Sequence, residues 1–378
     1  FDKHLYNGHV PVSAIYAFLG ILNALLHDYS YVVASNEYSS SFGNTIYKGL
    51  EINHQWSKSF EFEQLFKDYV SNFITKDVTY FSLLRPFYEI RIVKMFAKHK
   101  KYFPVFSSCN RNFAFNKDHV GLWCCECAKC VFAFTLLSAF LGRKELVEIF
   151  DKNLYQDEDL LPLFKDILGL GTAKPFDCVG TFGEAQTALH MAQEKFADDF
   201  IMAQLSGPTA PSAVRHAKEV FKTNKESLVP AAFSLLGMEN ALILGYGREG
   251  KVTEEYLKKE YPNIKVGIAD EKEGAGYLSK QEEYDIAIKT PGVKKELVMI
   301  LHTSATNLFF SKVLEKHTVV GITGSKGKST TTSLIFEMLK EAGKPVALLG
   351  NIGKPMLEAL LHPITQGQIF VVELSSYQ

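Results

Sequence analysis

Short apolar runs alternate with glycine-rich turns and charged stretches from about residue 239 to the end of the chain. Apolar runs of this length, separated by helical stretches, are typical of the strands of a parallel sheet. The runs and their following turns are NALILGYGREG (240–250), IKVGIAD (264–270), YDIAIKTPGV (284–293), TVVGI (318–322), PVALLGNIG (345–353) and IFVVELSSYQ (369–378). We therefore expect an α/β fold with two successive units of parallel strands in this part of the chain.

The first 225 residues differ from this pattern and are rich in Phe, Tyr and His. Apolar runs such as YSYVVAS (29–35) end in polar loops, which also predicts strands. The segment 205–218 contains glycine and prolines that indicate a linker, and a second boundary falls near 308–317. We predict three parts: a first module over 1–225, a small Rossmann-like domain over 226–312, and the start of a nucleotide-binding domain over 313–378.

Composition limits the class of protein. The 378 residues include 41 Lys and Arg and 42 Asp and Glu, a net charge of −1, which does not favour nucleic acid or an anionic membrane as a partner. Hydrophobic residues make up 47% and charged residues 22%, as in packed globular proteins. The longest apolar stretches, 14–26 and 131–141, are too short to span a membrane. The chain starts with Phe1 and without a signal-like segment, so we expect a window of a longer cytoplasmic chain.

Cysteines gather in one short region. Cys124, Cys127 and Cys130 form C-x-x-C-x-x-C, and Cys109 precedes them by 15 residues. Four thiolates at this spacing suit a tetrahedral structural Zn²⁺, with Cys125 outside the ligand set. A buried cluster of thiols without metal and an iron–sulfur cluster are the alternatives.

The stretch GITGSKGKSTTT (321–332) predicts a phosphate-binding loop between a strand and a helix. Glycines allow backbone N–H groups to turn toward phosphate oxygens, and the helix N-terminus adds partial positive charge. Lys328 would reach the terminal phosphates, and Ser329 or Thr330 would bind Mg²⁺. Ile322 stands where the strict G-x-x-x-x-G-K-[ST] pattern has its first glycine, and a glycine-rich turn without a ligand is the alternative. The candidate ATP-binding residues are Gly324, Ser325, Lys326, Gly327, Lys328, Ser329 and Thr330.

Lacking that first glycine, the loop resembles that of the Mur ligases, which add amino acids to UDP-N-acetylmuramate with ATP and whose loop reads GTNGK-[ST]. GNIGKP (350–355) and VVELSSYQ (371–378) resemble two further motifs of this family. Lys326 stands where the family has Asn, which adds a positive charge beside the phosphates. The roles that the resemblance implies are Mg²⁺ binding by Ser329 and Glu373, and contact with the muramoyl substrate by Asn351, Ser375 and Gln378.

The glycine turn at 245–250 is a G-x-G-x-x-G after a strand, which alone indicates a dinucleotide site, and an NAD-binding unit is the alternative here. Followed by the Mur ligase motifs, it resembles the N-terminal uridine-nucleotide domain of the glutamate-adding, MurD-type ligases. KTPGV (289–293) resembles another turn of that domain. The resemblance implies UDP-substrate contacts at Gly245, Gly247, Gly250 and Asp270. It covers 239–378, which is only the first part of such a ligase, so we expect no ligation by this stretch alone.

Five stretches of the first 225 residues together resemble the MurL-type epimerases: NGHVPVSA (7–14), SNEYSSSFGN (35–44), NHQWSKSFEFE (53–63), YFSLLRP (80–86) and KPFDCVGT (174–181). That family inverts the terminal L-glutamate of UDP-N-acetylmuramoyl-L-alanyl-L-glutamate with ATP and Mg²⁺. The cysteine cluster also resembles the zinc end of one group of PP-loop ATP pyrophosphatases, which implies a PP-loop-like α/β module. The S-G-G-K-D-S loop of that group is absent from the 378 residues, so we expect it before Phe1.

Polar loops after apolar strands supply the candidate catalytic residues. An acyl adenylate removes the negative charge of the glutamate carboxylate, so a positioned base can take the Cα proton and reprotonation on the other face inverts the centre. We predict that Glu37, His54 and Lys58 line this site, and each of them is alternatively a structural hydrogen-bonding residue. Cys178 is either an acid/base thiol or a small packing residue. Further polar candidates are His9, Asn36, Asn53, Arg85 and Asp177.

Both resemblances point to one substrate. We expect a fused chain for peptidoglycan precursor synthesis, whose partners are a UDP-N-acetylmuramoyl-peptide and glutamate, with ATP, Mg²⁺ and structural Zn²⁺ as cofactors. The alternatives are a zinc-held PP-loop module that acts on tRNA or another carboxylate, and a non-catalytic fragment that binds a UDP-sugar.

Overall fold

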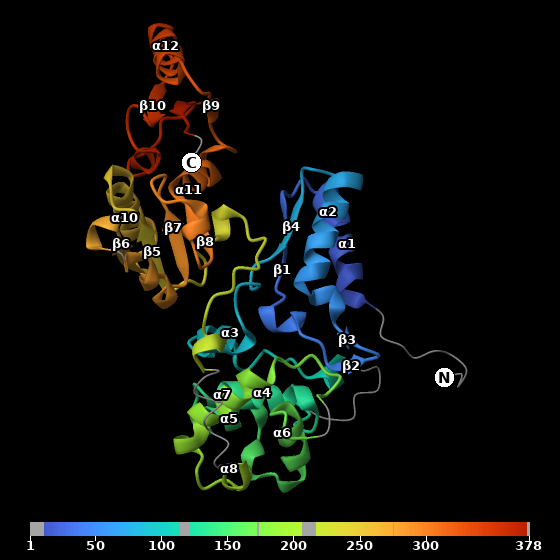
Figure 1. Ribbon diagram of the computed structural model, residues 1–378. Helices are drawn as coiled ribbons and strands as arrows, with labels where there is room; N and C mark the ends of the chain where they lie inside the picture. Colours follow the sequence, from blue (N-terminus) through green and yellow to red (C-terminus); the bar gives the residue numbers. More distant parts are fainter. Residues whose placement is uncertain (1–10, 114–120, 172–173, 206–216, 275, 376–378) are drawn as a thin grey trace. The chain divides into compact units, whose positions relative to one another are not determined.

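The computed structural model describes residues 11–113, 121–171, 174–205, 217–274 and 276–375 (Figure 1). The chain divides into two compact units, 1–228 and 229–378. Parallel strand pairs occur in both units, so the fold is of the mixed α/β kind. None of the helices in the described ranges combines the length and the apolar character needed to cross a membrane.

The first unit begins with a small two-layer arrangement. Strands β1 (Tyr31–Ala34) and β4 (Thr79–Ser82) pair in parallel, and helices α1 (Val12–Leu26) and α2 (Phe60–Phe73) pack against them (Figure 1). Helix α2 begins at Ser59, whose hydroxyl accepts a hydrogen bond from the Phe62 N–H. Between β1 and α2 lie the short hairpin β2 (Thr45–Tyr47) and β3 (Leu50–Ile52) and two 3₁₀ turns. The carboxyl ends of β1 and β4 thus lead directly into the polar loops that carry candidate residues.

The rest of the first unit is helical over its described residues. Every residue of α4 except Ala133 is buried, so this helix shows no amphipathic pattern in the sequence. Its Phe134 contacts Phe150 and Tyr155, with ring centroids 5.2 and 4.9 Å apart. The helices are α3 (Glu89–Phe96), α4 (Ala128–Ser138), α5 (Arg143–Phe150), α6 (Leu161–Ile167), α7 (Phe182–Ala192) and α8 (Phe200–Leu205).

The second unit holds two parallel sheets. The first has the order β6-β5-β7-β8 and is flanked by α10 (Arg248–Glu260) and α11 (Ala305–Val313). Its strands are β5 (Asn240–Leu244), β6 (Lys265–Ala269), β7 (Ile286–Lys289) and β8 (His302–Ser304). The two neighbours of β5 in this sheet, β6 and β7, both follow it in sequence and lie on opposite sides of it. The turn after β5 therefore lies at the point where the connections diverge, a position that favours ligand binding.

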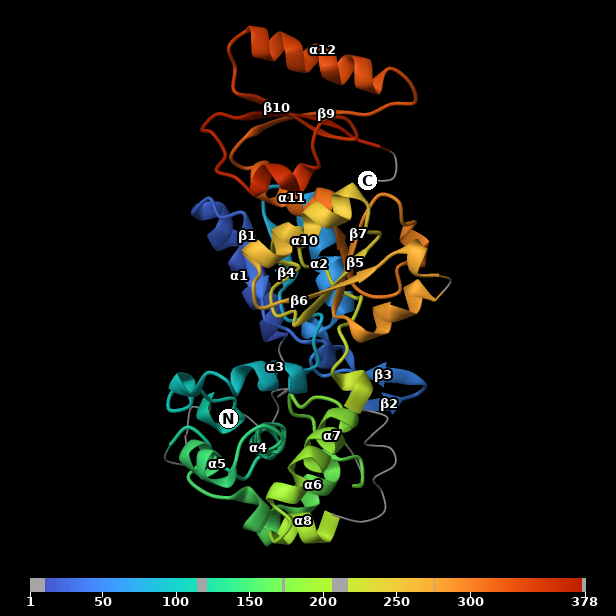
Figure 2. The ribbon, with the colours of Figure 1, turned by 90° about the vertical axis from the view of Figure 1, so that its left-hand side faces the viewer.

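The second sheet has the order β10-β11-β9, with strands β9 (Thr318–Ile322), β10 (Val346–Gly350) and β11 (Ile369–Glu373). Helix α12 (Lys328–Glu341) lies across one face of this sheet (Figure 2). The ring of Phe309 in α11 contacts Phe370 in β11 at 5.3 Å, which joins the two sheets within one unit. The loop from β9 to α12 and the end of β11 therefore meet at the carboxyl edge of the sheet.

Candidate functional site

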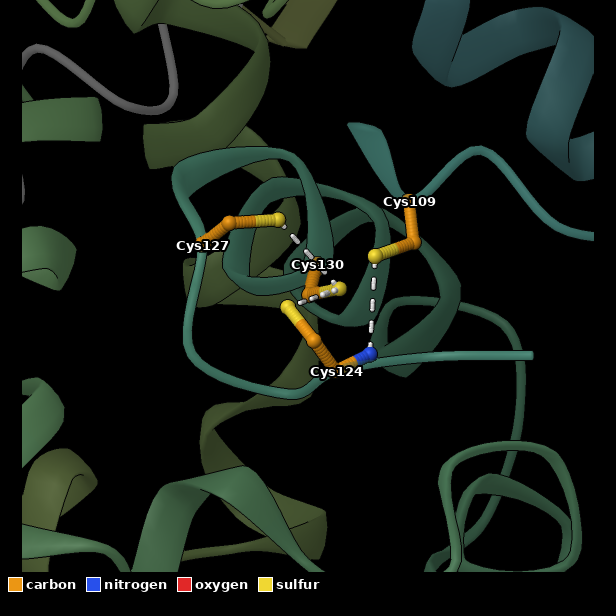
Figure 3. Close-up of side chains that lie close together, drawn as sticks. All are labelled: Cys109, Cys124, Cys127 and Cys130. Carbon is orange, nitrogen blue, oxygen red and sulfur yellow. Dashed lines mark hydrogen bonds between the residues drawn. The ribbon is translucent and has the colours of Figure 1, made fainter. Parts of the chain in front are cut away.

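Four cysteines of the first unit converge on one point (Figure 3). The sulfur atoms of Cys109, Cys124, Cys127 and Cys130 all lie within 4.8 Å of one another. The Sγ atom of Cys130 is 3.7 Å from that of Cys124 and 3.5 Å from that of Cys127. Tetrahedral zinc thiolates with bonds of about 2.3 Å have sulfur atoms about 3.8 Å apart. The four side chains therefore fit a metal ion as a group.

The ionisation of these thiols favours a cation. Hydrogen bonds from neighbouring thiols, with that of Cys130 first, lower the pKa of Cys127 to about 5, whereas burial raises the pKa of Cys124. A cation bound by the four sulfur atoms would replace the protons of the thiols. Cys125 stands apart, because its thiol donates to the Phe150 carbonyl at 3.2 Å and burial raises its pKa to about 12.

Lys129 lies between two cysteines of the cluster and interacts with two partly buried acids, Glu89 and Glu37. It lies between Cys127 and Cys130 at the start of α4, and its Nζ donates to Glu89 Oε1 at 3.0 Å. Burial opposes the charge of Lys129, but Glu89 and Glu37 outweigh burial and raise its pKa. The pKa of Glu37 is itself raised, first by burial and then by Glu89. The beginning of α4 therefore presents sulfur ligands and a cation that neutralises two acids.

Two of the predicted catalytic residues contact Cys178, one of the two cysteines outside the metal set. Lys58 Nζ donates to Cys178 Sγ at 3.3 Å, and His54 Nε2 lies 3.8 Å from the same sulfur. Glu37, the third predicted residue, interacts electrostatically with Lys58. We call Lys58, His54 and Cys178 the polar cluster. Cys178 is about 120 residues away in the sequence from Lys58 and His54, so no local motif predicts the contact.

Asn44 sets the hydrogen bonding of His54. Its Nδ2 donates to the Pro175 carbonyl at 2.8 Å, which turns its Oδ1 toward His54 Nδ1 at 2.5 Å. An amide oxygen only accepts, so this network assigns the proton of a neutral imidazole to Nδ1. The Nε2 atom that faces Cys178 is then the acceptor.

Arg85 connects the loop that carries Glu37 to the loop that carries Lys58. Its side chain is fully buried and pairs with Glu63 at 2.8 Å. The guanidinium also donates to the carbonyl oxygens of Glu37 and Lys58, each at 2.6 Å. Arg85 was one of the polar candidates in the sequence, and these contacts make it a positioning residue for the two segments.

Glu184 was not among the candidate residues, although Thr181-x-x-Glu184 is the pattern of a capping box at the start of α7. Its carboxylate accepts from the Ser39 hydroxyl at 2.9 Å and from the Ile90 N–H at 3.1 Å. Burial raises its pKa to about 7. Glu184 thus ties α7 to α3 and to the loop that carries Glu37.

The remaining polar candidates make contacts within the protein. Asn53 Nδ2 donates to the Ser40 carbonyl at 2.9 Å, and Asn110 Nδ2 donates to Asp177 Oδ1 at 2.5 Å. The carbonyl of Asn36 accepts from the Ser82 hydroxyl at 2.6 Å. These contacts give structural roles to their segments, while His9 lies outside the described residues.

In the second unit, the glycine turn after β5 is tightly built. Gly245 has φ of +88°, and a Cβ there would lie 2.3 Å from Thr290 Oγ1. A Cβ on Gly250 would lie 2.4 Å from the Gly245 carbonyl oxygen, so the start of α10 packs directly on the turn, and Gly247 caps that helix. Asp270, at the end of β6, accepts from the Tyr246 N–H at 2.5 Å. The four residues with an implied UDP contact therefore lie at one sheet edge.

The loop between β9 and α12 has the backbone that a phosphate site requires. Gly324 and Gly327 have φ of +149° and +75°, in the region that favours glycine. Lys328 is the first residue of α12, and its Nζ donates to the Gly324 carbonyl at 2.7 Å, across the loop. Ser329 and Thr330 follow in the first turn of the helix, and the loop residues Ser325 and Lys326 are exposed.

Glu373 ends the central strand of this sheet, in register with Ile322 and Gly350. It is only 4% exposed, and its Oε2 atom has no hydrogen-bond partner among the described residues. A buried carboxylate oxygen without a partner beside a phosphate loop fits a Mg²⁺ ion. The Asn351 N–H donates to the Glu373 carbonyl at 3.1 Å, while Gln378 lies outside the described residues.

Three family models match the chain: the MurL N-terminal domain over 2–83, the MurL C-terminal domain over 105–220, and the Mur ligase middle domain over 322–378. A UDP-N-acetyl-alpha-D-muramoyl-L-alanyl-L-glutamate epimerase of Xanthomonas oryzae is 43% identical over 185 residues, which are 49% of this chain and 41% of that protein. A Micromonospora epimerase of the same name is 39% identical over 50% of this chain and 42% of its own length. A UDP-N-acetylmuramoylalanine--D-glutamate ligase of Oenococcus oeni is 34% identical over 37% of this chain and 34% of its own length. The chain thus spans less than half the length of each of these relatives.

Proposed function

We propose that this chain, in which MurL N- and C-terminal domains precede part of a Mur ligase middle domain, epimerises the terminal glutamate of UDP-N-acetylmuramoyl-L-alanyl-L-glutamate. The polar cluster carries the proposal. Lys58 and His54 lie in the stretch that matches the N-terminal MurL domain, and Cys178 lies in the stretch that matches the C-terminal one. Both domains are therefore needed to assemble the cluster, as expected of a shared active site.

The chemistry of the cluster suits this reaction. When ATP and Mg²⁺ activate the glutamate α-carboxylate as an acyl adenylate, the Cα proton becomes acidic enough to be removed. Lys58 places a positive charge next to the anionic substrate, and His54 offers a proton acceptor whose orientation Asn44 sets. Glu37, with its raised pKa, lies near Lys58 in a partly buried environment. We assign substrate contact to Glu37, His54 and Lys58.

Deuterium incorporation tests this function. The complete native protein, incubated in D₂O with the L,L-muropeptide, ATP and Mg²⁺, is expected to place deuterium at the glutamate Cα and to release AMP and pyrophosphate. Mass spectrometry and chiral analysis of the released glutamate measure both changes. The same incubation without ATP is the control and is expected to leave Cα protonated. Absence of deuterium and of AMP in the complete reaction would reject the function.

The four-cysteine cluster supports a structural metal, for which we propose Zn²⁺. All four ligands are sulfur, three of them are buried, and they surround the N-terminus of α4 in the helical core. The PP-loop-like fold of the first module, and domain boundaries near 225 and 312, belong to the same proposal.

For the second unit we propose ATP-dependent addition of L-glutamate to UDP-N-acetylmuramoyl-L-alanine, which would make the substrate of the epimerase. The phosphate loop would hold ATP, with Ser329 and Glu373 as Mg²⁺ ligands. The glycine turn at 245–250 with Asp270 would bind the UDP group. Asn351 and Ser375, near the end of β11, would contact the muramoyl part, together with Gln378.

In a Lys328→Met variant of the complete native protein, ADP formation is expected to fall by at least about 10²-fold in the presence of UDP-N-acetylmuramoyl-L-alanine and glutamate. The reason is that the transferred phosphate loses the positive charge of the lysine beside it. The matched control is Lys340→Met, at the exposed far end of the same helix. A coupled ADP assay measures both. Equal rates in wild type and Lys328→Met would remove this loop from the chemistry.

A further inference from the structure

The roles proposed above for Glu37, His54 and Lys58 leave Cys178 without a function. Its sulfur is nevertheless the atom that both Lys58 and His54 contact. A thiol that only fills space resembles Cys125, which is 4% exposed in the aromatic core and donates to a backbone carbonyl. Cys178 is instead partly exposed and has a lysine ammonium at 3.3 Å and an imidazole nitrogen at 3.8 Å. These neighbours are the ones that activate a thiol for chemistry.

We propose that Cys178 Sγ is the atom that takes the Cα proton from, or returns it to, one face of the activated glutamyl residue. This inference rests on the proposed epimerase function. The acceptor Nε2 of His54 faces the sulfur, since Asn44 assigns the ring proton to Nδ1. The Sγ–H bond therefore has a base at one side, and the sulfur has a cationic donor, Lys58, at the other.

The proton balance is simple. The Cys178 thiol gives its proton to His54 Nε2, and the thiolate remains hydrogen-bonded to the Lys58 ammonium. The thiolate then removes the Cα proton of the acyl adenylate, and the electron pair of the C–H bond moves into the activated carbonyl as an enolate. The enolate gains a proton from solvent on its other face, while His54 returns its proton to solvent. No oxidant, reductant or covalent adduct is needed.

Several contacts keep the sulfur in place. The Phe176 ring, two residues before Cys178, meets the His54 ring edge-on at 6.2 Å, and Asn44 holds the Pro175 carbonyl of the same segment. Arg85 fixes the Lys58 backbone from the other side. Lys58 and Lys129 are the cations that act on the sulfur, while Glu37 and Glu89 offset Lys129. The sulfur is thus positioned by both halves of the first unit.

A Cys178→Ser variant of the complete native protein separates proton transfer from activation. Deuterium incorporation at Cα and epimerisation are expected to fall by about 10²–10⁴-fold, the usual contribution of a general acid–base group. Muropeptide-dependent exchange of pyrophosphate into ATP is expected to stay within a few-fold of wild type, because adenylate formation does not use the sulfur. Cys125→Ala, a variant of the packing cysteine, is the matched control and is expected to retain both activities.

A second measurement uses the wild-type protein and therefore does not require that a variant fold correctly. Iodoacetamide treatment of the wild-type protein is expected to stop deuterium incorporation in step with alkylation of Cys178, measured by peptide mass spectrometry, and the muropeptide is expected to protect it. The proposal would be overturned if Cys178→Ser incorporated deuterium at the wild-type rate. It would also be overturned if the variant lost both pyrophosphate exchange and deuterium incorporation. An acyl adduct on Cys178 released by hydroxylamine would likewise overturn it, because the sulfur would then be a nucleophile. If wild type itself shows neither exchange, the epimerase function fails instead.

Discussion

A Cys124→Ser variant is expected to lose the proposed metal ion and to destabilise the helical part of the first unit by on the order of 4 kcal/mol or more, a size typical of the loss of a structural metal. A hydroxyl is a poor replacement for a thiolate ligand, and Cys124 is buried among the other sulfurs. Residues 121–127 form neither helix nor strand, so side-chain contacts and the proposed ligand bonds, rather than a backbone ladder, hold them beside α4. Lys129 would shift with them and leave Glu37 and Glu89 without their shared cation.

Urea denaturation followed by far-UV circular dichroism, with metal content from mass spectrometry, measures this change. Wild type treated with a strong chelator is expected to show the same loss. Cys125→Ala is the matched control, because Cys125 lies in the same loop but bonds to Phe150, and it is expected to retain its metal. A metal-free wild type with an unchanged urea midpoint would show that the four thiols pack without a structural ion.

Sequence patterns were sufficient where the chemistry lies in adjacent residues. The spacing of Cys109, Cys124, Cys127 and Cys130 predicts one four-thiolate group, and the structure brings the four sulfur atoms together. The glycines of the phosphate loop predict a turn that directs backbone N–H groups toward phosphate, and Gly324 and Gly327 adopt positive φ in that turn. In such motifs the covalent chain itself fixes the distances, so one short stretch is enough.

The contacts between distant segments could not be predicted in this way. Glu37, His54 and Lys58 were candidates from their polar loops, but the contact of Lys58 with Cys178 depends on how two halves of the unit pack. Helix α4 is buried on nearly all sides, so its apolar residues show no helical period that would reveal its partners. Lys129 lies between two ligand positions in the sequence, and only its burial beside Glu89 shows its role.

Replacing Arg85 by Met is expected to destabilise the first unit by about 3–5 kcal/mol, the cost of breaking a buried ion pair from one side. Glu63, 1% exposed, would keep a buried charge whose remaining bond to the Ser82 N–H, at 2.9 Å, does not neutralise it. The carbonyls of Glu37 and Lys58 would also lose their donor. Urea denaturation of the variant and wild type measures the free energy of unfolding. A change below about 1 kcal/mol would mean that water replaces the guanidinium at little cost.

A double variant separates the two roles of Arg85. Arg85→Met with Glu63→Leu removes both charges, and apolar replacements of buried ion pairs are often neutral in stability, so most of the lost free energy is expected to return. The loops of Glu37 and Lys58 would still lack the donor that joins them, so epimerisation is expected to stay at least about 10-fold below wild type, because displaced catalytic groups lose rate. Arg85→Lys with Glu63 intact keeps the charge but cannot reach both carbonyls, and an intermediate rate is expected. Full activity in the stable double variant would show that the polar cluster requires neither the ion pair nor the bridge between the loops.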